Sequence, residues 1–145
     1  MMTRMKVFIA TSYSSQVNHE TGEVFPEYKE WLENILCEIE AAGHAVFCAL
    51  RADGYRINAD DPVDAFRLDM RHIRDSTAVL ALLGENVSVG VQTEIGVGIA
   101  LEMPVILAHD PRQELAYFNG AMLKAGVVSE LLLPLDRQKL DAVLR

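Results

Sequence analysis

The chain has 145 residues, of which 50 % are hydrophobic and 23 % charged, and its net charge is −8 at pH 7. This length suits one domain, residues 1–145, which can bury a core without disulfides. The negative charge argues against a nucleic-acid polymer as partner, because counterion release requires clustered Lys and Arg. No apolar run approaches a membrane span, and the start MMTRMKVF lacks a signal-peptide layout, so we expect no membrane segment and a cytoplasmic location.

The first half of the chain predicts two strands, each followed by a helix. Short apolar runs indicate the strands, and apolar residues at three- and four-residue steps indicate the helices. Proline at the first turn and glycine after the last turn mark helix ends. The expected elements are a strand over 5–11, a polar loop over 12–22, a helix from Pro26 to Gly43, a strand over 44–49, a loop over 50–61, and a helix over 62–75 with Asp60 or Asp61 as its N-cap.

The second half continues the same alternation. The runs 78–83 and 104–108 are almost wholly apolar, as is typical of parallel strands covered on both faces. We expect a helix between them that ends near Glu102, preceded by a loop that contains Ser88, Gly90 and Gln92. A helix around 112–124 closed by Gly126, a short edge strand over 131–135 and a helix over 136–144 complete the chain.

Five strands that alternate with helices predict an α/β fold, a single-domain, doubly wound five-stranded parallel sheet with the flavodoxin/Rossmann-like order 2-1-3-4-5. In this arrangement the order in which strands are added to the sheet reverses between the first and third strands. Ligands of such sheets bind beyond the carboxyl ends of those two strands. The loops at Ser12 and Ser88 would then face each other across one crevice, with Glu94 between them.

Glu94 is the one charged side chain between Asn86 and Leu101, in an otherwise apolar or uncharged stretch. It should lie in the first turn of its helix, where the helix dipole favours a negative charge. A favourable first-turn acid is the simple structural interpretation. A lone charge in an apolar segment at the reversal point of the sheet favours catalysis instead.

Asp69 is the second candidate, because it borders the apolar stripe of the helix over 62–75. Two carboxyl groups at one site can divide the work of glycosidic cleavage, one attacking the anomeric carbon and the other assisting the leaving group. The structural alternative is an ion pair of Asp69 with Arg51, Arg56 or Arg71.

Three serines and an aromatic residue are candidate substrate contacts. Ser12, Ser14 and Ser88, with the backbone N–H groups around Gly90, could hold a hydroxyl or phosphate, although serines in loops more often form turns. Tyr13 could stack on a base or sugar, although packing is the simpler role for an aromatic at a strand end.

The sequence gives no reason to expect a metal or cofactor. The four histidines, His19, His44, His72 and His109, have no metal-like spacing, nor do Cys37 and Cys48, which we interpret as buried reduced thiols. No P-loop lysine and no dinucleotide-binding glycine motif follows a strand.

The segments KVFIATSYSS, the Asp69 helix with DSTAVLALL, and SVGVQTEIGVGIALEMPVI resemble the nucleoside 2-deoxyribosyltransferase-like family over the whole chain. The spacing of Ser88, Gly90 and Glu94 is similar to its branch of nucleoside 5'-monophosphate N-hydrolases. This resemblance implies Glu94 as nucleophile, Asp69 as partner carboxylate, and Ser12 and Ser88 as contacts to a 5'-phosphate. It also implies a homodimer or higher homo-oligomer in which Asn119 or Gly120 of one subunit closes the other's site.

The resemblance leaves the reaction and the substrate open. Hydrolysis of a nucleoside or nucleoside 5'-monophosphate is favoured over base exchange, because Ser88 and Val91 stand where transferases tend to carry Asp and Thr. Ser14 and Thr11 also depart from the Arg and Gly usual in the deoxynucleotide hydrolases. A nucleotide-binding module without turnover is the alternative from another class.

Overall fold

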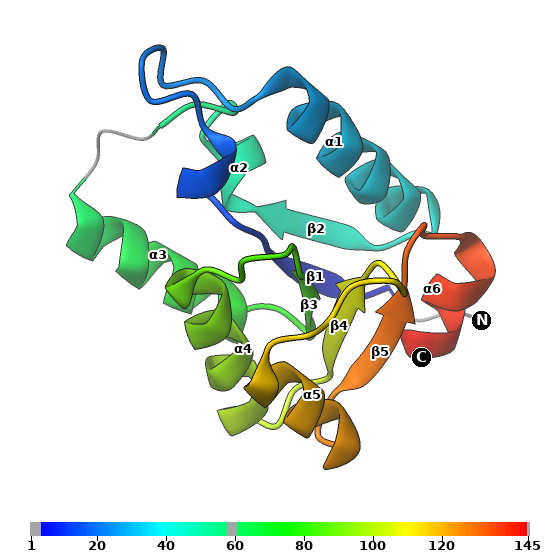
Figure 1. The fold of residues 1–145 in the computed structure, drawn as a ribbon. Coiled ribbons are helices and arrows are strands. Elements are labelled where there is room, and N and C mark those ends of the chain that lie inside the picture. The colour runs from blue at the N-terminus through cyan, green and yellow to red at the C-terminus, as the bar shows by residue number, and fades with distance from the viewer. Residues whose placement is uncertain (1–3, 58–60, 145) are drawn as a thin grey trace.

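A computed structural model of the chain describes residues 4–57 and 61–144 (Figure 1). Its centre is a five-stranded, all-parallel sheet with the order β2-β1-β3-β4-β5, which confirms the fold class predicted from the sequence. The strands are β1 (Lys6–Ala10), β2 (Ala45–Cys48), β3 (Ala78–Leu82), β4 (Val105–His109) and β5 (Ser129–Leu132).

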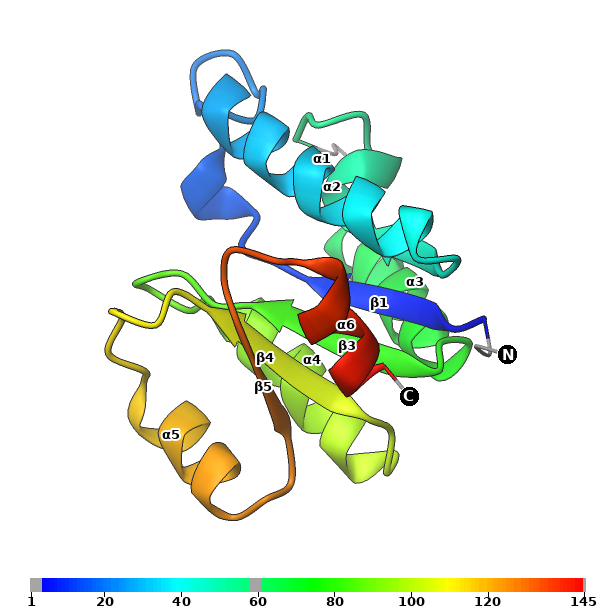
Figure 2. The same cartoon turned by 90° about the vertical axis from the view of Figure 1, so that its right-hand side faces the viewer.

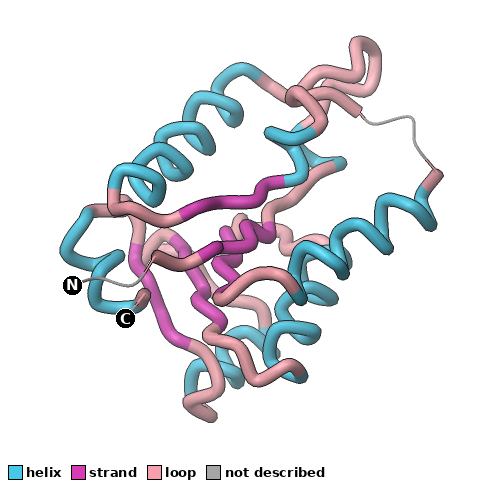
Figure 3. The backbone as a smooth tube through the Cα atoms, turned by 180° about the vertical axis from the view of Figure 1, so that it is seen from behind, coloured by secondary structure: helices cyan, strands magenta, loops and turns pink. Residues whose placement is uncertain are grey.

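Helices cover both faces of this sheet (Figures 2 and 3). One face packs against α1 (Pro26–Ala41) and α6 (Arg137–Val143). The other packs against α3 (Pro62–Arg74), α4 (Val89–Ala100) and α5 (Tyr117–Lys124). Neighbouring residues of a strand therefore enter different clusters. Ile9 lies in the first and Phe8 in the second, as expected for side chains that alternate across a sheet.

The helix expected around 112–124 begins later than predicted, at Tyr117. Asp110 is the cause. Its carboxylate accepts a hydrogen bond from the Arg112 backbone N–H at 2.8 Å, and its carbonyl accepts one from Gln113 N–H at 3.0 Å, so this segment forms a turn. Asp side chains commonly favour such turns over helix.

Three further expectations need correction. The last strand is β5, Ser129–Leu132, rather than 131–135, so Pro134 follows the strand in a segment with a cis Leu133–Pro134 bond. The expected loop over 50–61 contains the short helix α2 (Ala49–Ala52). Cys37 is exposed, whereas Cys48 is buried.

The start of α3 was predicted correctly in part. Asp61 is its N-cap and accepts a hydrogen bond from the Val63 backbone N–H at 2.8 Å. The other candidate cap, Asp60, lies outside the described residues, as do 58 and 59. Within the residues that the structure describes, none of the helices is long and apolar enough to pass through a bilayer.

Gly98 allows α4 to lie close against the sheet. A Cβ atom at this position would stand 2.9 Å from Cγ2 of Val105 and 3.1 Å from Cγ2 of Val79, closer than side-chain carbons normally approach. Both valines belong to fully covered strands, so neither can move without disturbing the core. The absence of a side chain at residue 98 therefore sets how near α4, with Glu94 on it, sits to β3 and β4.

We expect Gly98→Ala to lower the free energy of unfolding by about 1–3 kcal/mol, the usual cost of overpacking a filled core. Gly96→Ala is the matched control on the same helix, because its added Cβ meets nothing within 4 Å. That control should be neutral or stabilise by up to about 1 kcal/mol through helix propensity. Urea unfolding of both variants measures the difference, and equal stability of the two would contradict the close contact at Gly98.

Candidate active site

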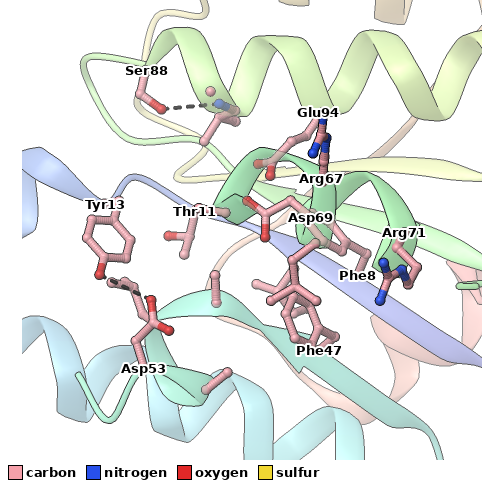
Figure 4. A pocket seen from close by; sticks show the side chains of 18 of the residues that line it. Phe8, Thr11, Tyr13, Phe47, Asp53, Arg67, Asp69, Arg71, Ser88 and Glu94 are labelled. Atoms are coloured by element: carbon pink, nitrogen blue, oxygen red, sulfur yellow. Dashed lines mark hydrogen bonds between the residues drawn. The ribbon is translucent and has the colours of Figure 1, made fainter. Parts of the chain in front are cut away.

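A pocket of about 730 Å³ opens beyond the carboxyl ends of β1, β2 and β3, where the order of the strands reverses (Figure 4). Its size falls in the range of small-molecule sites. Its floor includes Phe8, Thr11 and Phe47, and its walls are formed by α2, α3 and the first turns of α4. The pocket lies at the edge of the sheet predicted from the strand order and includes Ser88 and Glu94, but Ser12 is not part of its lining.

Glu94 lies in the second turn of α4, which begins at Val89, and not in the first turn as the sequence predicted; it contributes to this pocket. Its surroundings are Val91 and Ile95, which belong to the apolar cluster beneath α4. Burial, and to a smaller extent the nearby carboxylate of Asp69, raise the pKa of Glu94 to about 8. The pocket therefore disfavours the charged form of this side chain.

Asp69 projects from α3, and its carboxyl group points toward that of Glu94 (Figure 4). Burial, and to a smaller extent the negative charge of Asp53, raise the pKa of Asp69 to about 6. Two of the three arginines suggested as partners of Asp69 form ion pairs with other residues. Arg51 pairs with Glu33 and Glu40 at 3.0 and 2.9 Å, and Arg56 pairs with Glu23 at 3.3 Å.

The amino-terminal turn of α4 forms one side of the pocket. Ser88 is the N-cap, and its Oγ accepts a hydrogen bond from the Val91 backbone N–H at 3.2 Å. Ser88 and Gly90 both line the pocket. The first backbone N–H groups of a helix point out of its end and attract anions and hydroxyl groups. This turn can therefore bind the oxygen-rich end of a ligand.

Tyr13 and Asp53 form the side of the pocket opposite α4 (Figure 4). The Tyr13 hydroxyl lies 2.8 Å from the carbonyl oxygen of Arg56 and 3.2 Å from Oδ2 of Asp53. Its aromatic ring packs against the core cluster formed with α1. Tyr13 is thus held at both ends, and its position makes it both a packing residue and a wall of the site.

The remaining predicted contacts lie outside the pocket lining. Ser12 is buried, with 7 % of its surface exposed, and Ser14 is exposed in the 3-10 helix Ser14–Gln16. Asn119 is fully buried on α5. Its amide exchanges two hydrogen bonds with Gln92, at 2.8 and 3.0 Å, and so ties α5 to α4. The structure therefore brings together Glu94, Asp69, Tyr13, Ser88 and Gly90.

Sequence reasoning missed several residues that line this pocket. Phe47 stacks on His72 with ring centroids 3.5 Å apart and lies 5.7 Å from Phe8. Arg67 projects from α3 beside Asp69. Asp53 follows α2 and also lines the pocket. Position could have indicated Phe47 and Asp53, since residues at or just after the end of a parallel strand lie at the ligand-binding edge of the sheet.

The charges of the lining are unbalanced. Four acids, Asp53, Asp64, Asp69 and Glu94, face the pocket, against two arginines, Arg67 and Arg71. Among the described residues, no three His, Cys, Asp or Glu side chains are arranged to hold a metal ion. These side chains can act as acids, bases or nucleophiles. Because acids outnumber arginines, the lining can also stabilise a positive charge that develops on the ligand.

Neither the known protein-family models nor the curated proteins give a match to this sequence. Several solved structures, in contrast, are similar to this structure. The structure of BlsM has a TM-score of 0.75 and 22 % identity, over 96 % of this chain and 88 % of that chain. The CMP N-glycosidase BcmB of Clostridium botulinum has a TM-score of 0.67 and 21 % identity, over 94 % of this chain and 98 % of that chain.

A third likeness is to a 2-deoxyribosyltransferase from Bacillus psychrosaccharolyticus, with a TM-score of 0.58 and 19 % identity over 78 % of each chain. All three identities are low, so these likenesses establish a common fold. The nucleoside 2-deoxyribosyltransferase-like fold expected from the sequence is therefore the fold that this chain adopts.

Proposed function

We propose that this protein is an N-glycosidase that cleaves the bond between base and sugar in a nucleoside or nucleoside 5'-monophosphate. The observation that carries the proposal is the pair of carboxyl groups, Glu94 and Asp69, that share one pocket at the reversal point of the sheet. The likeness to a CMP N-glycosidase and a 2-deoxyribosyltransferase supports the same chemistry.

The protonation of the pair suits a retaining mechanism. With a pKa of about 6 for Asp69 and about 8 for Glu94, the two carboxyl groups together hold one proton between these pH values. A retaining glycosidase needs one ionised carboxylate to attack and one carboxylic acid to protonate the leaving group. A pair of carboxyl groups that holds one proton provides both the carboxylate and the carboxylic acid.

In the proposed reaction, Glu94 is the nucleophile. As the base departs, positive charge develops at C1' of the sugar, and this favours the ionised form of Glu94, so that the shared proton is on Asp69. A Glu94 oxygen bonds to C1', the C1'–N bond breaks with its electron pair going to the base, and Asp69 protonates the base. Asp69 then takes a proton from water, which attacks C1' and releases the sugar and Glu94.

The amino-terminal turn of α4 favours one orientation of the sugar. Its backbone N–H groups around Ser88 and Gly90 suit the 5' end, whether that carries a hydroxyl or a phosphate. Glu94 lies one to two turns further along the same helix, toward C1'. The base then extends away from α4, toward Tyr13 and Asp53.

Base exchange uses the same covalent intermediate and differs in the acceptor. The pocket opens to solvent, and Asp64 and Arg67 at its lining are exposed, which favours water as the acceptor. Incubation with a nucleoside and a different free base distinguishes the reactions. Release of base without formation of the new nucleoside supports hydrolysis, and accumulation of the new nucleoside would assign the protein as a transferase.

We expect Glu94→Gln to lower the rate of base release by roughly a thousandfold or more, because glutamine cannot attack C1'. Released base is measured by chromatography, with ribo- and deoxynucleosides and their 5'-monophosphates as substrates. The control Glu85→Gln alters an exposed acid outside the pocket and should keep wild-type rates.

A melting experiment distinguishes loss of the nucleophile from loss of the fold. Because the folded protein raises the pKa of Glu94, folding favours its neutral form, and stability that depends on this group falls as the pH rises through about 8. A neutral glutamine should therefore melt at or above the wild-type temperature at pH 8. Full activity in Glu94→Gln would contradict the assignment of Glu94 as the nucleophile. If a ligand stabilised the wild type but no base were released, the protein would be a binding module.

We also expect a bell-shaped pH profile of kcat/KM with limbs near pH 6 and pH 8. Below about 6 both carboxyl groups are protonated and the nucleophile is lost, whereas above about 8 both are ionised and the acid is lost. In Asp69→Asn the alkaline limb should disappear. The acidic limb should then follow Glu94 alone, with a pKa below 8 because the Asp69 charge is removed. An unchanged upper limb would exclude Asp69 as the acid.

We propose in addition that the protein forms a homodimer through the start of α5. Tyr117 and Phe118 are 88 % and 70 % exposed, and their rings lie 5.7 Å apart. Neighbouring exposed aromatic rings are typical of protein interfaces. Since Asn119 is already bonded to Gln92 within its own chain, we assign the contact to the two aromatic residues.

Light scattering should give a mass near twice 16.1 kDa for the wild type. The double variant Tyr117→Ser, Phe118→Ser should give the monomer mass, because it removes apolar surface that only a partner would cover. Ile57→Ser, at another exposed apolar residue, is the control and should remain dimeric. A monomeric wild type would contradict the proposal.

A further inference from the structure

One side chain on the floor of the pocket has no role in the reaction described so far, and its place follows from the strand order. Thr11 comes directly after β1, and β1 lies between β2 and β3 in the sheet. Two walls of the pocket follow those neighbours, α2 after β2 and α4 after β3. Thr11 therefore stands near the middle of the floor, and its side chain lies in the pocket between Tyr13 and Asp69 (Figure 4).

A second hydroxyl group, from α1, orients this side chain. The hydroxyl groups of Thr11 and Tyr28 form a hydrogen bond. The ring of Tyr28 packs against the core cluster beneath α1 and lies 5.3 Å from the ring of Trp31. Thr11 is thus held by a residue that does not itself line the pocket.

The pair of hydroxyl groups leaves one proton for a ligand. Each hydroxyl has one proton to donate and can also accept a hydrogen bond. A phenol is more acidic than an alcohol and is the better donor, and burial raises the pKa of Tyr28, so Tyr28 keeps its proton and donates it to Thr11. The proton of Thr11 then has no acceptor among the residues that the structure describes, and it is available to a ligand.

All the common bases carry an acceptor atom beside the glycosidic nitrogen. Pyrimidines have the carbonyl oxygen O2 there, and purines have N3. On the proposed function, C1' lies at Glu94, and the base extends away from α4 across the carboxyl end of β1. The part of the base that lies over Thr11 is then the part next to the glycosidic bond.

We propose that Thr11 is a catalytic residue, whose hydroxyl, oriented by Tyr28, donates a hydrogen bond to O2 of a pyrimidine or N3 of a purine. The electron pair of the breaking C1'–N bond passes into the base, so negative charge builds on that acceptor atom until the base is protonated. A donor that is already oriented stabilises this charge more than it stabilises the bound nucleoside. Thr11 keeps its own proton throughout, and Asp69 remains the acid that protonates the base.

This inference rests on the proposed glycosidase function, and substrates that lack the acceptor atom test it. In 3-deazaadenosine a C–H group replaces N3 of adenosine, and in 2-thiocytidine a weakly accepting sulfur replaces O2 of cytidine. The pair is taken from the class of base that the wild type cleaves. We expect Thr11→Val to lower kcat/KM by about 10-fold to 100-fold on the parent nucleoside, the range of a hydrogen bond to a charged group, and by less than about threefold on the analogue. An equal loss on both members of the pair would overturn the proposal.

Three comparisons control this experiment. Thr11→Ser retains the hydroxyl and should stay within about threefold of the wild type. Thr93→Val makes the same change at an exposed threonine of α4 outside the pocket lining, whose hydroxyl donates to the Val89 carbonyl at 2.8 Å, and should keep wild-type rates. Thr11→Val should slow the ribo- and 2'-deoxyribonucleosides of one base equally. A loss confined to the ribonucleoside would move the contact to the 2'-hydroxyl and overturn the proposal.

Tyr28→Phe tests the positioning role of Tyr28. Phenylalanine keeps the ring but cannot orient Thr11, so we expect kcat/KM to fall by about threefold to tenfold on the parent nucleoside and to stay unchanged on the analogue. The double variant Thr11→Val, Tyr28→Phe should be no slower than Thr11→Val alone, because the hydroxyl of Tyr28 acts only through Thr11. Additive losses in the double variant would contradict that role.

A binding measurement separates failure of this inference from failure of the proposed function. Titration calorimetry of Glu94→Gln with both members of a pair measures the contact without turnover. We expect the parent nucleoside to bind about twofold to tenfold more tightly than the analogue, and Thr11→Val in the Glu94→Gln background to remove the difference. That result supports the contact even if the wild type releases no base. Equal binding of the two members overturns it, whatever the activity of the wild type.

Discussion

The site depends on one electrostatic constraint, the placement of two partly buried carboxyl groups close together on the wall of the pocket, where water cannot readily solvate two charges. Burial alone raises the pKa of Glu94 and of Asp69, and the charge of each neighbour adds to it. Like charges in a poorly solvated site share a proton instead of both ionising. An arrangement of this kind reduces stability and is retained where chemistry requires it.

The fold holds this unfavourable pair by fixing the two helices that carry it. α3 is capped by Asp61 and α4 by Ser88, so each helix begins at a defined residue and presents its acid at a defined angle. Gly98 brings α4 close to β3 and β4. Asn119 and Gln92 tie α4 to α5 through buried amides. Elements far from the pocket therefore determine how near Glu94 stands to Asp69.

The sequence predicted the sheet, its strand order and the meeting of Glu94 with Asp69, because apolar periodicity and the topology of parallel sheets are local or general rules. It did not predict the turn at Asp110, where a side chain competes with helix formation. It also could not show that Asn119 points into the protein or that Asp53 faces the pocket. Those properties depend on contacts with Gln92 and Tyr13, which are distant in sequence.

The surplus of acids in the pocket has a consequence for the substrate. An oxocarbenium-like transition state is positive at C1', and carboxylates around it stabilise that charge more than they stabilise the neutral ground state. The same carboxylates repel an anion placed among them. A 5'-phosphate is therefore compatible with this pocket only at the amino-terminal turn of α4, where the backbone N–H groups near Ser88 and Gly90 offset the repulsion. On the proposed function, the position suited to a phosphate and the position suited to bond cleavage are thus separated along one helix.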